Sequence, residues 1–136
     1  MRKFRQWLMI SSVLAVFATT SVFAEEESVW KFDDEHRILK EYTGEDREVT
    51  VPDTLMGCSV DGVGSNAFCN SEITSLTFPE TVQYLNASVA AHCESLSELK
   101  LPQSLVMIGD GCFVAAALQE VTIPANVRVF GEHAFS

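Results

Sequence analysis

The chain is poor in basic residues: its 136 residues include 9 lysines and arginines against 19 aspartates and glutamates. Three of the bases, Arg2, Lys3 and Arg5, fall in the first 24 residues, so the rest of the chain is more acidic still. Nucleic-acid binding needs clustered lysine and arginine to neutralise phosphates, so the charge argues against nucleic acid as a partner. Hydrophobic residues still make up 47% of the chain, which is typical of a folded protein and not of a disordered acidic tail.

Long apolar runs are also lacking, except for one at the N-terminus. A short basic segment is followed by an apolar stretch from Trp7 to Val22, and Val22 and Ala24 place small residues ahead of an acidic run that begins at Glu25. This order is typical of a secretory signal peptide. A retained membrane anchor is the alternative, but the stretch is interrupted by serine and threonine and is short against the roughly 20 apolar residues that cross a bilayer. We therefore expect residues 1–24 to be cleaved off and the mature chain to be secreted or held at the cell surface.

Residues suited to catalysis or metal binding are few and scattered. The chain has three histidines and four cysteines, with no Cys-x-x-Cys pair and no two histidines in related positions. A nucleophile needs an oriented base, and a zinc site needs closely spaced ligands, so we expect no enzyme, no metal and no other cofactor. Disulfides persist in exported proteins. We nevertheless expect packed free thiols at Cys58, Cys69, Cys93 and Cys112. At least one disulfide bridge among them is the alternative. Cys112 is expected to be buried.

The four prolines stand at regular spacings. Each ends an apolar-x-apolar-Pro phrase, and successive prolines are 27, 23 and 22 residues apart. The alternation is that of a short strand, and proline follows where no further backbone donor is needed. A unit of about 23 residues cannot bury its own apolar face, so the repeat predicts a solenoid of stacked coils. The phrases begin at Val49, Leu76, Leu99 and Val121.

Stacking predicts which side chains lie inside the coils. Two internal ladders are expected, one of Val49, Leu76, Leu99 and Val121 and one of Val51, Phe78, Leu101 and Ile123. A second phrase, of the Ile-Gly-x-x-Ala-Phe kind, recurs, and we expect its glycine to supply a tight turn that a side chain would obstruct. Its phenylalanine should fill the coil, as Phe68, Phe113 and Phe135. Ala90 replaces that phenylalanine in the second unit, which should be either repacked around Val89 or locally loose.

The two phrases resemble the BspA-type leucine-rich repeats of bacterial surface and secreted proteins. The resemblance rests on the rhythm of residues 96–102, on the Ile-Gly phrases and on the opening unit from Tyr42 to Val60, and it covers about residues 38–136. It implies a leucine-rich-repeat solenoid, α/β or mostly β, with a parallel strand ladder and short helical or irregular returns. It also implies a role in adhesion or protein binding without catalytic residues.

The expected organisation follows from these repeats. Residues 49–136 form the array, with units at about 49–75, 76–98 and 99–120 and an incomplete unit at 121–136. Residues 25–48 lack the repeat phrase and read as two strands about a polar turn, which we expect to cap the first coil. The last coil has no successor, so end-to-end self-association through it is a further expectation.

A candidate binding face follows from the same alternation, because the residue between two buried positions points outward. In stacked coils two such columns are expected, one of Thr50, Thr77, Lys100 and Thr122 and one of Glu48, Ser75, Glu98 and Glu120. Hydroxyls beside carboxylates on a flat strand face suit hydrogen bonding to a protein or glycan, although threonine is favoured in strands whatever their function. The leading hypothesis is an exported, non-enzymatic binding module. The alternative is the targeting domain of a larger secreted enzyme.

Overall fold

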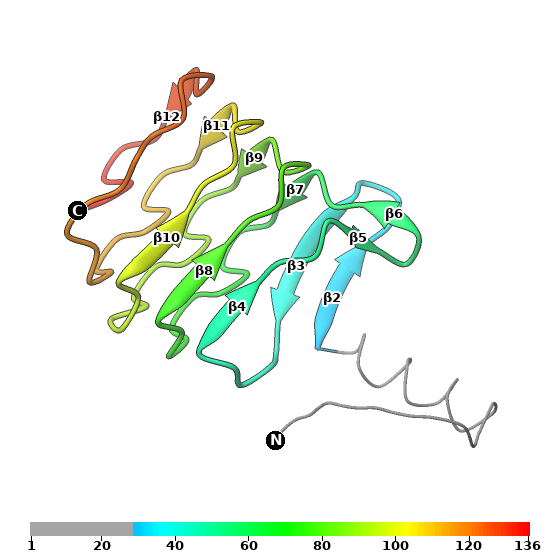
Figure 1. Cartoon of the computed structure of the whole chain (residues 1–136), viewed down its shortest axis with the longest axis horizontal. Coiled ribbons are helices and arrows are strands. Elements are labelled where there is room, and N and C mark those ends of the chain that lie inside the picture. The colour runs from blue at the N-terminus through cyan, green and yellow to red at the C-terminus, as the bar shows by residue number, and fades with distance from the viewer. Residues whose placement is uncertain (1–28) are drawn as a thin grey trace.

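A computed structural model describes residues 29–136, and the expected signal peptide lies outside this range. The described chain is a solenoid of about four turns built from parallel strands, stacked along one axis from the N-terminal to the C-terminal end (Figure 1). Helical returns do not occur in residues 29–136. The returning half of each coil carries a second short strand instead, so the fold is mostly β.

The first sheet contains the strands predicted from the proline phrases. Strands β4 (Glu48–Thr50), β8 (Ser75–Thr77) and β10 (Glu98–Lys100) are parallel and lie in the order β10-β8-β4. Val49 pairs with Leu76, and Leu76 pairs with Leu99, as the ladder prediction requires. The prediction is wrong for the fourth coil: its phrase forms no strand, Val121 is only partly buried and Ile123 is 37% exposed.

The second sheet has six strands. Its parallel members are β7 (Gly62–Val63), β9 (Tyr84–Leu85), β11 (Met107–Ile108) and β12 (Val129–Phe130). The second residue of β7, β9 and β11 points inward, and Val63, Leu85 and Ile108 are completely buried, whereas Phe130 in β12 is 52% exposed. Packing between the two sheets therefore forms the core that no single coil could form.

An antiparallel hairpin of β2 (Trp30–Asp33) and β3 (Ile38–Tyr42) completes the second sheet at its N-terminal end. The two strands about a polar turn are thus confirmed, and β3 pairs in parallel with β7 of the first coil. Trp30 packs on Tyr42 with ring centroids 4.7 Å apart, and Tyr42 packs on Phe68 at 5.6 Å. Aromatic side chains therefore join the hairpin to the core of the first coil.

The interiors of the coils are filled much as the sequence indicates. Phe68 and Phe113 are 2% and 1% exposed, whereas Phe135 in the last coil is only partly buried. In the second coil Val89 and Ala90 are both completely buried. The coil is therefore closed without a phenylalanine at Ala90, as expected if it is repacked around Val89.

The glycines of the Ile-Gly phrase are required for a different reason from the one expected. A side chain at Gly109 would begin 2.7 Å from the backbone carbon of Asn86, so the glycine allows two coils to approach closely. Gly109 does not itself have the positive φ of a tight turn. In each coil the residue two positions later does have a positive φ, as Asn66, Ser88, Gly111 and His133.

The longer first unit is explained by a small extra hairpin. Strands β5 (Thr54–Leu55) and β6 (Cys58–Ser59) are antiparallel and are joined by Met56 and Gly57, which have φ angles of 52° and 76°. Two central residues with positive φ are the mark of a type I′ turn. The hairpin projects at one corner of the first coil (Figure 1), where it lengthens the unit without interrupting the strand ladder.

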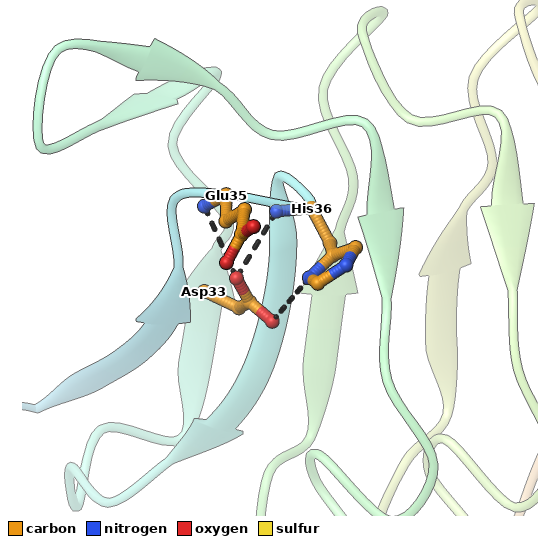
Figure 2. A network of polar contacts seen from close by, with 3 residues as sticks. All are labelled: Asp33, Glu35 and His36. Atoms are coloured by element: carbon orange, nitrogen blue, oxygen red, sulfur yellow. Dashed lines mark hydrogen bonds and ion pairs between the residues drawn. The ribbon is translucent and has the colours of Figure 1, made fainter.

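The turn between β2 and β3 is held by one carboxylate (Figure 2). Asp33 Oδ1 accepts hydrogen bonds from the backbone N–H groups of Glu35 and His36, at 3.1 and 3.0 Å. Asp33 Oδ2 lies 2.9 Å from His36 Nδ1. The hydrogen bonds from the backbone and ring of His36 lower the pKa of Asp33, and the hydrogen bond to Asp33 followed by its negative charge raises the pKa of His36.

We expect the ion pair between Asp33 and His36 to stabilise the turn only in the pH range where Asp33 is ionised and His36 is protonated. The raised His36 pKa means that its contribution is complete below the ordinary histidine pKa and is lost as the pH rises through the folded value. The lowered Asp33 pKa means that its contribution is complete above the ordinary aspartate pKa and is lost as the pH falls through the folded value. An NMR titration of the His36 ring should give a lower pKa in Asp33→Asn than in the wild type. Because asparagine keeps the oxygen that accepts the backbone bonds, identical values in both proteins would show that the ion pair does not form.

Candidate binding face

The outward side chains of the first sheet form the predicted grid over three coils. Residues Glu48, Ser75 and Glu98 are register partners in one row, and Thr50, Thr77 and Lys100 are partners in the next. Ser75 and Thr77 in the central strand are partly buried, and the other four are exposed. Adjacent strands lie about 4.8 Å apart, so neighbouring groups of the grid can contact a single partner side chain.

The fourth pair of predicted residues lies beside the sheet and not in it. Glu120 and Thr122 are exposed, but they belong to a segment without strand structure. Glu120 lines a depression of about 430 Å³ together with Glu98 and Lys100, and Thr122 lines an adjoining one of about 320 Å³. The structure therefore brings both residues to the edge of the grid, although not in the predicted register.

The grid is available for charge pairing with another molecule. Three ion pairs occur within residues 29–136, and none of them uses Glu48, Glu98, Lys100 or Glu120. Three carboxylates against one ammonium make the face acidic. Such a surface suits a partner that presents basic groups and hydrogen-bond donors.

The opposite sheet presents an apolar row that the sequence pattern does not predict. Tyr84, Met107 and Val129 are register partners on its outer side, and Tyr84 and Val129 are 37% and 53% exposed. The sequence does contain one indication of this row. Strands β9, β11 and β12 have apolar or aromatic residues at both positions, whereas a strand with one face in solvent would alternate apolar and polar residues. This row is the rival to the acidic grid as a contact surface.

The cysteines are free thiols, as expected. Cys93 is buried and its Sγ donates to the Phe68 carbonyl at 3.0 Å. Cys112 is buried as predicted, and burial raises the pKa of its thiol to about 12, so it stays protonated and unreactive at neutral pH. Across residues 29–136, no three histidine, cysteine or acidic side chains are grouped so that they could hold a metal ion. The same range contains no helix with the length and hydrophobicity that a bilayer requires.

Comparison with known families identifies the repeat. The family model described as the BspA type leucine rich repeat region (6 copies) matches residues 47–136. The chain belongs to the BspA-type leucine-rich repeat family. No curated protein matches it. Family membership makes the chain a leucine-rich repeat module, which is consistent with a protein-binding repeat domain.

Solved structures of leucine-rich repeat proteins have a similar fold. A leucine-rich repeat protein from T. pallidum is 21% identical, with a TM-score of 0.63, over 78% of this chain and 62% of its own. One from Bacteroides capillosus is 25% identical, with a TM-score of 0.59, over 70% of this chain and 86% of its own. One from Bacteroides ovatus is 24% identical, with a TM-score of 0.52, over 78% of this chain and 36% of its own. The chain thus spans less than two thirds of the T. pallidum protein.

Proposed function

We propose that this chain is the binding module of an exported, non-enzymatic protein, and that it holds a protein partner at the cell surface through the outward face of β4, β8 and β10. The observation that carries the proposal is the in-register grid from Glu48 to Lys100, whose charged groups form no ion pair within residues 29–136. The inner side of the same strands is packed in the core, so the grid is rigid and loses little entropy on binding. Family membership supports binding, and the apolar leading segment supports export.

A partner that fits this face carries lysine or arginine side chains that form ion pairs with the carboxylates. It also carries hydrogen-bond donors that bind the hydroxyl groups. A surface protein of a host cell or of a neighbouring bacterium can present these groups, and adhesion is the role that results. A glycan would use the hydroxyl row but would leave the acidic row without an opposite charge. The acidic excess therefore favours a protein over a glycan.

End-to-end association is a second part of this proposal. Val129 and Phe130 in β12, at the C-terminal edge of the six-stranded sheet, are 53% and 52% exposed. An edge strand with exposed apolar side chains is a surface on which another strand can pair.

Changing the centre of the grid should weaken partner binding at least tenfold, which is the size expected for residues central to an interface. The test uses the double substitution Thr77→Arg and Lys100→Glu, with the partner first isolated by capture from host-cell and bacterial-surface extracts. The dissociation constant is then measured for both proteins, and circular dichroism checks that the fold is retained.

The matched control is Tyr84→Arg, which places an equally large charged side chain on the opposite sheet. We expect it to leave the affinity within about twofold of the wild type, as for a residue outside the interface. If Tyr84→Arg abolishes binding and the double substitution does not, the partner uses the apolar row and the proposed face is wrong.

A further inference from the structure

In the first sheet, the backbone hydrogen bonds that join one coil to the next stop at β10, although the second sheet continues from β11 to β12. Just beyond β4, the Val51 N–H donates to the Thr77 carbonyl at 2.9 Å. Just beyond β8, the Phe78 N–H donates to the Lys100 carbonyl at 3.2 Å. The third member of this series is the N–H of Leu101, which has no backbone partner within residues 29–136 although Leu101 is only 9% exposed. Backbone donors in folded proteins are nearly always paired, so this N–H is open to a partner.

The same edge of β10 is open at Leu99. The Glu98 N–H donates to the Thr74 carbonyl, and the Lys100 carbonyl accepts from Phe78, so the backbone groups of Glu98 and Lys100 face β8. Backbone groups alternate in direction along a parallel strand. Those of Leu99 therefore face away from β8, where no hydrogen bond from another described residue reaches them.

The segment that would close this edge is detached. Residues 118–123 form no backbone hydrogen bond within the described part of the chain. The coil is held on either side, where the Ala117 N–H donates to the Leu96 carbonyl at 2.9 Å and the Arg128 N–H donates to the Val106 carbonyl at 2.7 Å. The depression of about 320 Å³ lies between β10 and this segment, with Leu99, Leu101 and Val121 in its lining.

Electrostatic repulsion opposes pairing of this segment with β10. In the repeat register Glu120 would stand directly opposite Glu98, and like charges in that position destabilise a strand pair. The first three coils avoid this conflict because Ser75 separates Glu48 from Glu98.

We propose that the open edge of β10 accepts an extended segment of a protein partner as an added parallel strand, which displaces residues 118–123. The backbone groups of Leu99 and Leu101 supply the hydrogen bonds, as in other cases of strand addition. A basic residue of the partner stands opposite Glu98, an apolar residue continues the ladder at Leu99, and a hydroxyl or acidic residue stands opposite Lys100. The site rests on the proposed function, since it specifies how a protein partner engages this sheet.

The sequence of β8 supplies a suitable probe. Its residues already pair with the other edge of β10, with Ser75 opposite Glu98 and Thr77 opposite Lys100. The peptide Thr-Lys-Leu-Thr-Phe-Pro copies residues 74–79 with lysine at the position of Ser75. At saturation it should slow amide hydrogen exchange at Leu99 and Leu101 at least tenfold, as measured by NMR. The same peptide methylated on the backbone nitrogens of its lysine and second threonine should have no effect, because those two groups would face β10.

A charge exchange tests the predicted pairing. A peptide with glutamate in place of the lysine should bind the wild type about fivefold more weakly, in keeping with the size of cross-strand charge effects. The Glu98→Lys variant should reverse this preference. An unchanged preference would overturn the pairing at Glu98.

Three further results would overturn strand addition itself. Leu99 and Leu101 amides protected in the dilute protein without peptide would show that residues 120–122 close the edge. Protection that grows with protein concentration would show that a second copy occupies it. Failure of the peptide to protect either amide would show that the edge accepts no strand. Capture of a partner that depends on Thr77 and Lys100 would still support the proposed function in each case.

Discussion

Replacing Phe113 with alanine should lower the free energy of unfolding by about 3–5 kcal/mol, the usual cost of removing a buried phenylalanine side chain. Phe113 is 1% exposed, and its ring stacks on Phe135 with centroids 5.2 Å apart. The cavity would lie between the third and fourth coils, next to the Phe135 ring. Urea denaturation followed by circular dichroism measures the loss.

The matched control is Phe130→Ala, which removes the same side chain from a position that is 52% exposed. We expect it to cost less than about 1 kcal/mol, because little buried area is lost. Equal costs at the two positions would contradict the assignment of Phe113 to the coil interior.

Replacing Gly109 with alanine should destabilise the protein by about 3 kcal/mol, near the upper end of the range for overpacking. The new Cβ would lie 2.7 Å from the carbon of Asn86 and 2.8 Å from the backbone nitrogen of Ala87. Both are backbone atoms of the preceding coil, so the clash cannot be relieved by rotating a side chain. The two coils would have to separate, and thermal or urea unfolding would report the cost.

Gly111→Asn is the matched control, two residues away in the same coil. Gly111 has φ of 59°, and the nearest atom to an added Cβ is Ser88 Oγ at 3.7 Å. Asparagine adopts this backbone conformation readily, and Asn66 already does so in the first coil with φ of 65°. We expect a change within about 1 kcal/mol. A large loss in Gly111→Asn with none in Gly109→Ala would reverse our account of the two glycines.

The sequence predicts the coil stacking well because burial leaves a strong signal there. Within the phrases that begin at Val49, Leu76 and Leu99, apolar residues alternate with period 2, and each phrase ends at a proline. The first sheet and its outward columns therefore follow from this spacing alone. The buried phenylalanines follow in the same way.

The second sheet could not be predicted by the same means. Its strands are two residues long in the coils, and Tyr84 and Val129 put large apolar side chains on the solvent side, so no alternation is visible. The role of Gly109 could not be predicted for a related reason. Whether Gly109 makes a turn or allows a close approach depends on the neighbouring coil, which local sequence does not describe.

The separation of residues 118–123 from β10 involves two acidic residues that are distant in the chain. Glu98 and Glu120 are each ordinary exposed acids, and their conflict arises only when the register places them opposite each other. The phrase Glu120-Val121-Thr122 has good strand propensity by itself. Sequence pattern therefore predicted a strand that charge opposes.

The hairpin of β5 and β6 shows where this architecture can absorb new sequence. The Val60 N–H donates to the Asp53 carbonyl at 2.9 Å, which closes the hairpin at its base, and no atom lies within 4 Å of a Cβ built at Gly57. The pairing of β4 with β8 therefore does not depend on the length of this hairpin. Evolution can exchange Met56 and Gly57 for longer loops here, and a designer can graft a foreign epitope, while the spacing of the array stays the same.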